Sequence, residues 1–180
     1  MTKPTILTIC GSLRAGSVNR KLLAEAVALF GPATVIKADL RLPLYDGDLE
    51  DAQGIPGAVL ALADQIRQAD GIILSSPEYN KGITGVLKNA LDWVSRVEGM
   101  VLKDKPLAVM SANDGRAGGE TGQYMLRACL TPLRPRIING PFVMVAGAAK
   151  VFESGRLDSP HYLKTLGLLM DALRAEIARD

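Results

Sequence analysis

The stretch that decides the fold is "ILTICGSLRAGSVNRKLL", which runs from Ile6 to Leu23. It opens with an apolar run typical of a buried strand and closes with the first turns of a helical pattern. Residues 11–19 between them are rich in glycine, serine, arginine and asparagine. A chain that leaves a strand through so polar a loop before starting a helix presents that loop as a candidate binding site.

The same alternation of strand and helix continues along the chain. Short apolar runs bounded by Gly, Pro or Asp are typical of strands buried on both faces. Right-handed crossovers between parallel strands place helices on both sides of the sheet. The sequence therefore predicts an α/β protein, a doubly wound three-layer sandwich with a five-stranded parallel sheet, and residues 39–55 read as a long surface connection. The expected strands lie near 5–10, 33–37, 71–75, 106–111 and 142–146, and the expected helices follow Ser17, Pro56, Gly85 and the Ser159-Pro160 cap.

The loop after the first expected strand has the chemistry of an anion site. Ser12, Ser17 and Asn19 offer neutral side-chain donors, and Arg14 offers a fork that suits phosphate oxygens. A helix that begins near Ser17 or Val18 also points unpaired backbone N–H groups at the same place. We predict a phosphate cradle here; the alternative is a polar strand-to-helix turn capped by Ser17.

Two more loops leave the third and fourth expected strands, and in such sheets ligands lie beyond the carboxyl ends of the strands. In "SSPEYNKGITG", Pro77 fixes the backbone, and acceptors and donors surround Tyr79, so the loop suits the edge of a flat heterocycle. The alternative is a turn with Tyr79 packed on the core. In "SANDGRAGGETGQ", four glycines between Gly115 and Gly122 indicate either close backbone approach to a ligand or a mobile flap.

The helix after the second loop carries a row of charges and the single tryptophan. Lys88, Asp92 and Arg96 lie four residues apart, as on a solvated helix face. Trp93 on the same helix is a candidate anchor for a subunit contact.

Composition and charge indicate the number of domains, the classes of partner and the cellular compartment. The 180 residues predict one domain, 1–180, and 21 basic against 19 acidic side chains give a net charge of +2, which implies neither a nucleic-acid nor a membrane partner. Cys10 and Cys129 lack the neighbouring ligands of a metal site and read as free thiols in a reducing compartment. Because the first residues run directly into a strand, we expect no signal peptide and a cytoplasmic protein.

Several familiar motifs are missing from the sequence. It has no Gly-Lys-Ser/Thr ending of a Walker loop, no G-x-G-x-x-G fingerprint and no G-x-S-x-G nucleophile elbow. His161, the only histidine, lies beside the last helix, where a surface or capping role is expected. We therefore predict no catalytic triad.

Together, "GSLRAGSVNRKLL", "LPLYDGD" and "QIRQADGIILSSPEYNKGITGVLKNALDWVSR" resemble the NADPH-dependent FMN reductase family, the flavodoxin-like group of quinone, chromate and azo-dye reductases. The resemblance covers nearly the whole chain and departs from the family pattern at Thr84 and Thr121, where proline and arginine are common. It implies FMN-binding residues in three segments. The first holds the phosphate, the second lines the isoalloxazine edge and the third also contacts the flavin: Ser12, Leu13, Arg14, Ser17, Val18 and Asn19; Pro77, Glu78, Tyr79 and Asn80; and Ser111, Asn113, Gly115 and Gly118.

The resemblance also implies a function. It implies an enzyme that passes hydride from NADPH or NADH through FMN to a quinone, an azo compound, chromate or free flavin by a ping-pong mechanism. The small-molecule acceptor is its expected partner, and a homodimer or homotetramer its expected assembly. Two alternatives stay open. One is a flavodoxin-type electron carrier, although the near-neutral charge differs from the acidic surface of flavodoxins; the other is a non-catalytic receiver-like domain, which would need acidic residues where Cys10, Gly11 and Ser12 stand.

Overall fold

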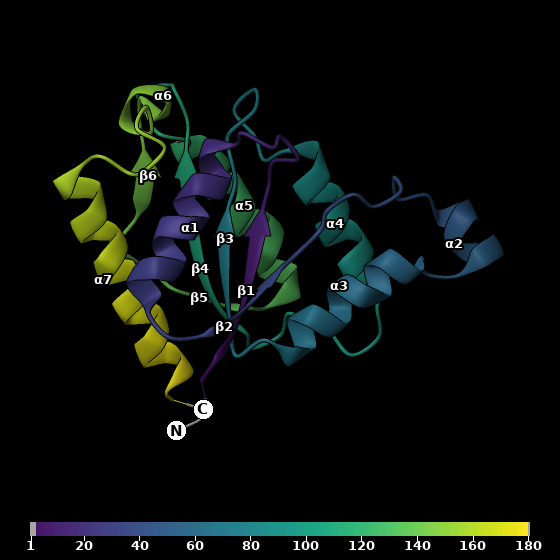
Figure 1. The fold of residues 1–180 in the computed structure, drawn as a ribbon. Helices are drawn as coiled ribbons and strands as arrows, with labels where there is room; N and C mark the ends of the chain where they lie inside the picture. The colour runs from purple at the N-terminus through teal and green to yellow at the C-terminus, as the bar shows by residue number, and fades with distance from the viewer. Residues whose placement is uncertain (1–2, 180) are drawn as a thin grey trace.

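In the computed structural model, which describes residues 3–179, one parallel sheet forms the centre of the molecule (Figure 1). The strand order is β2-β1-β3-β4-β5, and β6 also pairs with β4. All five pairings are parallel, so every crossover returns the chain to the same end of the sheet. The strands are β1 (Thr5–Cys10), β2 (Thr34–Lys37), β3 (Gly71–Ser75), β4 (Pro106–Ala112), β5 (Arg136–Ile137) and β6 (Val143–Val145).

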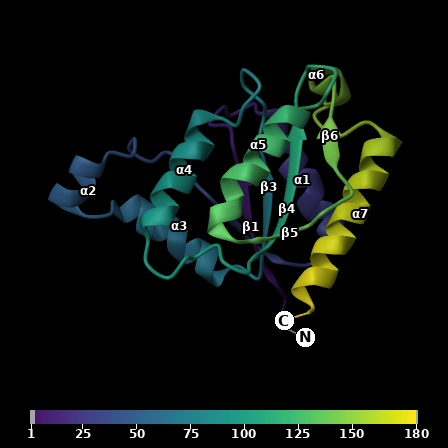
Figure 2. The same ribbon diagram turned by 180° about the vertical axis from the view of Figure 1, so that it is seen from behind.

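Helices cover both faces of this sheet, as Figures 1 and 2 show from opposite sides. α1 and α7 pack on one face, and α3, α4 and α5 pack on the other. This arrangement confirms the predicted three-layer α/β sandwich. The helices are α1 (Val18–Phe30), α2 (Gly47–Gln53), α3 (Gly57–Gln68), α4 (Gly85–Arg96), α5 (Glu120–Leu130), the 3₁₀ turn η1 (Thr131–Leu133), α6 (Ala148–Val151) and α7 (Pro160–Ile177).

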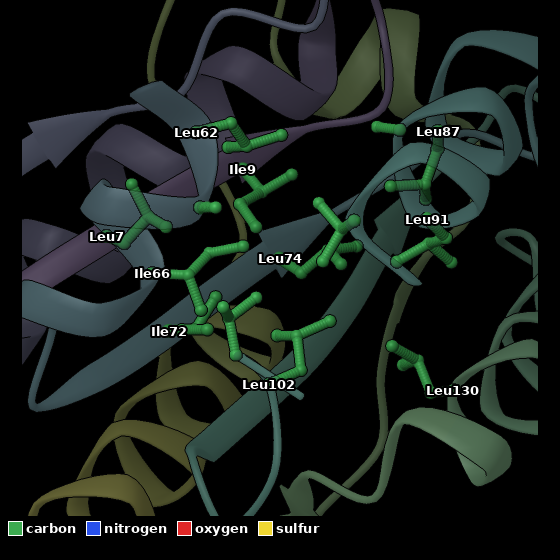
Figure 3. Packing of buried hydrophobic residues seen from close by; sticks show 14 of the residues in the cluster. Leu7, Ile9, Leu62, Ile66, Ile72, Leu74, Leu87, Leu91, Leu102 and Leu130 are labelled. Atoms are coloured by element: carbon green, nitrogen blue, oxygen red, sulfur yellow. The ribbon is translucent and has the colours of Figure 1, made fainter. Parts of the chain in front are cut away.

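Alternation along the strands divides the core into two layers. Leu7 and Ile9 of β1 point toward α3 and α4, whereas Ile6 and Cys10 point toward α1 and α7. Figure 3 shows the first layer, in which leucines and isoleucines of β1 and β3 meet those of the covering helices. The two apolar layers fix the register of the central strands and hold their carboxyl ends at one edge.

The fifth expected strand is the main difference from the predicted sheet. The sequence indicated one strand near 142–146, but β4 is paired along its length by two short pieces, β5 and β6. Pro141 lies between them and has no N–H to donate to a ladder, so the pairing is interrupted.

Residues 39–55 contain a helix that periodicity did not reveal. α2 has no buried residue, so it lacks the apolar stripe by which helices are found in a sequence. Asp46 caps its first turn by accepting a hydrogen bond from the Asp48 amide at 3.0 Å. Figure 1 shows this helix projecting to one side of the sandwich. The cap at Ser159 was predicted correctly, and its hydroxyl accepts from the Tyr162 amide.

Within residues 3–179, none of the helices combines the length and the apolar character that crossing a membrane requires.

Candidate flavin site

The three loops singled out in the sequence meet at the carboxyl edge of the sheet. β1, β3 and β4 are neighbours in the strand order, so the loops that follow them lie side by side at the upper edge in Figure 1. The Gly11 amide donates to the Ser75 carbonyl at 2.8 Å, which keeps the first loop against the second from its first residue. All fourteen predicted site residues therefore lie on one edge of the molecule.

The first loop, residues 11–17, presents backbone donors rather than a packed surface. Among the described residues, the amides at positions 13, 15, 16, 18 and 19 have no hydrogen-bond acceptor. Ser12 and Ser17 are buried, Arg14 is exposed, and the 13-residue helix α1 begins directly behind them. Unpaired amides at the positive end of a helix dipole suit an anion, so the loop fits a phosphate group.

Ser17 occupies the N-cap position of α1, but its side chain makes no capping hydrogen bond. Its hydroxyl oxygen lies 4.0 Å from the sulfur of Cys10 instead. The side-chain cap that the alternative reading assigned to Ser17 is therefore absent. The amides that such a cap would have satisfied stay available.

Asn19 has a different environment from the one its motif indicated. Its side chain is buried with 1% exposed. Its amide nitrogen donates to the Ala112 carbonyl at 2.8 Å, and its oxygen accepts from the Ala112 amide at 3.0 Å and the Ser75 hydroxyl at 2.8 Å. These bonds tie the first turn of α1 to the ends of β3 and β4, so Asn19 positions the three loops against one another.

Thr84 joins the first and second loops. Its hydroxyl donates to the Gly11 carbonyl at 2.7 Å and accepts from the Leu87 amide at 3.4 Å, which caps α4. Proline, which the family resemblance leads one to expect at this position, could form neither bond. Gly11 also packs closely on Ser76 of the second loop, because a Cβ at position 11 would lie 2.3 Å from the Ser76 hydroxyl oxygen.

Glu78 and Asn113 join the second and third loops. The Asn113 side chain accepts from the Glu78 amide and donates to the Glu78 carbonyl, both at 2.8 Å. The Glu78 carboxylate accepts from the Gly122 amide at 2.9 Å, in the first turn of α5. Both side chains and the Glu78 backbone groups are thus used inside the protein, which leaves the Tyr79 side chain and Asn80 of this loop to face a ligand.

The tip of the second loop is a tight turn. Tyr79 and Gly82 exchange two backbone hydrogen bonds of 3.0 Å, and Asn80 and Lys81 between them have positive φ of 49° and 67°. Positive φ at both central residues is typical of a two-residue hairpin turn. Tyr79 is 51% exposed rather than packed on the core, so the alternative reading of this loop is wrong.

The glycines of the third loop serve close packing within the chain. A Cβ on Gly118, at φ +59°, would lie 2.5 Å from the Met144 backbone, and one on Gly119 would lie 3.0 Å from Ser111. The Ser111 hydroxyl donates to the Gly118 carbonyl at 2.6 Å and accepts from the side-chain amide nitrogen of the buried Gln123 at 3.0 Å. Only Gly115 among these glycines faces open space.

Sequence reasoning missed the roles of Thr84 and Gln123. Thr84 was identified only as a departure from the family pattern, although threonine directly before a helix is a common N-cap signal. Gln123 gave no signal, because its partners, Ser111 and the Val143 carbonyl, come from distant parts of the chain.

Trp93 is not available for a subunit contact. Its side chain is fully buried, its indole N–H donates to the Pro43 carbonyl at 2.8 Å, and its ring packs edge-on against Tyr45. Its role is to hold the segment after β2 on α4. Of the charge row, Lys88 and Asp92 form an ion pair of 2.6 Å, whereas Arg96 pairs with Glu50 of α2.

Comparison with known proteins identifies the family. The sequence profile described as NADPH-dependent FMN reductase matches residues 4–150. The chain belongs to the NADPH-dependent FMN reductase family. This FMN reductase is 43% identical over 155 residues to an NAD(P)H-dependent FMN reductase of Pseudomonas aeruginosa, covering 84% of this chain and 83% of that protein. It is 40% identical over 146 residues to the quinone reductase of Escherichia coli, covering 79% and 77%.

A solved structure supports the same assignment. The flavoenzyme NAD(P)H:(acceptor) oxidoreductase FerB of Paracoccus denitrificans superposes with a TM-score of 0.86 and 29% identity, over 98% of each chain. The flavodoxin-like fold is therefore confirmed. Membership identifies FMN and NAD(P)H as the cofactors of this reductase, and the free amides of the first loop fit the phosphate of FMN.

Proposed function

We propose that this FMN reductase transfers two electrons from NADPH or NADH to a quinone, through FMN held by the loops after β1, β3 and β4. One observation carries this proposal: Asn19, Thr84 and Asn113 lock three strand-end loops into a preformed edge with unpaired amides at one end. Relatives named quinone reductase and NAD(P)H-dependent FMN reductase support the choice of donor and acceptor.

In this proposal the first loop binds the phosphate. The amides from Leu13 to Asn19 donate to its oxygens, and Ser12, Arg14 and Ser17 add side-chain donors. Arg14 is exposed and so can close over the anion without breaking a bond to another described residue.

The second and third loops bind the ring. Tyr79 supplies apolar surface and Asn80 supplies polar groups, while the buried Pro77 fixes the backbone before them and Glu78 and Asn113 hold the two loops together. Gly115 of the third loop faces open space, which leaves room for the ring. The Ser111 hydroxyl, which donates to the Gly118 carbonyl, helps to position these loops, and so does the Asn19 side chain.

Bound FMN supplies the hydride chemistry, and the chain supplies position and electrostatics. We propose that donor and acceptor bind in turn at one open side of the ring slot, which makes the mechanism ping-pong. Azo compounds, chromate and free flavin are further acceptors that such an open slot admits. We also propose that residues 1–180 form a single FMN-binding domain, that it assembles as a homodimer or homotetramer, and that it works in the cytoplasm.

The visible spectrum of the purified protein tests the proposal. FMN-loaded protein mixed with NADPH without air should lose its flavin absorbance, and a quinone added afterwards should restore it. Initial rates at varied NADPH and quinone should give parallel double-reciprocal lines, as a ping-pong mechanism requires. A flavin that stays oxidised under NADPH and NADH would instead support the electron-carrier alternative, and a protein that takes up no FMN would contradict the site itself.

A further inference from the structure

A trough runs down the flank of the molecule from the phosphate loop, between α1 and the edge strand β2. It consists of two hollows of about 470 Å³ and 420 Å³ that share Cys10, Arg20 and Ala38 and are therefore continuous. The upper hollow reaches Ser12 and Leu13 of the phosphate loop. Hollows of this size fall in the range of small-molecule sites, and the proposed FMN contacts occupy only the upper rim.

The lower half of the trough has two apolar walls. Leu23, Ala24 and Val27 form one wall on α1, and Val35 of β2 forms the other with 36% of its surface exposed. Cys10 lies at the floor of this half. Such a slot suits a flat, weakly polar group such as a purine ring.

The trough is also lined by cations. Arg20 and Lys37 line the lower hollow, Arg20 and Arg41 line the upper one, and Asp39 is the single carboxylate among these lining residues. Asp39 pairs with Arg41 at 3.1 Å, whereas neither Arg20 nor Lys37 has a carboxylate partner within residues 3–179. Arg20 donates only to the Ser12 carbonyl, at 3.3 Å. Two cations without a carboxylate partner, in the same hollow as the apolar walls, match a nucleotide that carries a phosphate on its ribose.

We propose that this trough binds the adenosine half of NADPH, with the purine between α1 and β2 and the 2′-phosphate between Arg20 and Lys37. The assignment rests on the proposed function, since it needs the nicotinamide at the ring slot above β3 and β4. β2 lies three strand intervals from β4, or about 14 Å at the usual spacing, a span that an extended dinucleotide bridges. The trough then makes the enzyme prefer NADPH to NADH.

The test uses FMN-loaded protein and adenosine 2′,5′-bisphosphate, which lacks the nicotinamide and so reports on the trough alone. Calorimetry should show binding to the wild type. Lys37→Gln removes a cation from β2, and Ala24→Trp fills the apolar half from an exposed position on α1. Lys37→Gln should weaken binding about tenfold, the scale of one charge-assisted hydrogen bond. Ala24→Trp should also weaken binding, because the indole occupies the space proposed for the purine. Lys164→Gln, the same change on α7 outside the trough, should leave binding unchanged.

Steady-state rates give a second measurement. Lys37→Gln should raise KM for NADPH about tenfold with kcat unchanged, and should alter KM for NADH by less than twofold, because NADH has no 2′-phosphate. Ala24→Trp should raise KM for both.

Two results would overturn the assignment: no binding of the bisphosphate to wild-type protein, or equal binding to wild type and both trough variants. Either result would still leave flavin reduction by NADPH and quinone turnover intact if the proposed function is right. Failure of the proposed function would instead appear as flavin that NADPH does not reduce in any variant.

Discussion

Replacing Asn19 with alanine separates two roles for this residue, a direct contact to FMN and a bond that holds the loops together. Alanine removes the three hydrogen bonds of 2.8 to 3.0 Å that Asn19 makes to Ala112 and Ser75. The partners are buried, so each loses a bond that water cannot easily replace. At about 1 kcal/mol for each bond, the apoprotein should lose about 3 kcal/mol of unfolding free energy.

For a chain of this size, that loss should lower Tm by about 6–12 °C. The measurement is urea and thermal unfolding of FMN-free protein, followed by circular dichroism, with FMN affinity measured by fluorescence quenching on the same samples. Asn139→Ala, at an exposed position, serves as the matched control and should stay within about 0.5 kcal/mol of the wild type.

The outcome that contradicts the positioning role is specific. If Asn19→Ala lowers FMN affinity while the apoprotein unfolds within about 0.5 kcal/mol of the wild type, Asn19 acts on the cofactor directly. If the apoprotein is destabilised and FMN affinity also falls, the loops depend on Asn19 before any ligand arrives.

Three further predictions address single contacts. Thr84→Val keeps the shape but removes the bond to Gly11 and the α4 cap, and should lower apoprotein stability by about 1–2 kcal/mol in urea unfolding; an unchanged midpoint would show that neither bond contributes. Arg14→Ala should weaken FMN binding by about 1.5–3 kcal/mol in a fluorescence titration without changing apoprotein stability, and an unchanged dissociation constant would refute its phosphate role. The hydrogen bond from Arg156 lowers the pKa of the buried Glu25 although burial opposes it, so the pair stabilises the fold above the unfolded pKa of Glu25 and loses that effect as pH falls through the folded pKa. Arg156→Gln should therefore raise the pKa of Glu25 and move the acid-unfolding midpoint to higher pH; a midpoint that stays in place would show that the pair does not act on stability.

Position in the sheet explains why the site could be located from the sequence. Each of the three polar loops directly follows an apolar strand, and parallel strands bring their carboxyl ends to one edge. The residue types of the first loop then indicate an anion.

The roles of individual side chains could not be located in the same way. In the motif, Asn19, Glu78 and Asn113 look like ligand contacts. In the structure, their polar side-chain atoms form hydrogen bonds to other segments of the chain. Trp93 looks like a surface anchor and is fully buried under the segment after β2. A sequence shows which groups can donate and accept, and only the folded chain shows which partners have already satisfied them.

The sequence by itself determined the α/β alternation, the sheet edge that carries the polar loops, and the family, because apolar periodicity and strand-to-helix turns are local properties. Tertiary structure alone decided how the last strand divides into β5 and β6, that Thr84 bonds to Gly11, and that a cationic trough lies beside β2. Those features join residues tens of positions apart. The contacts that make these features form only after two layers of core side chains have fixed the strands in register.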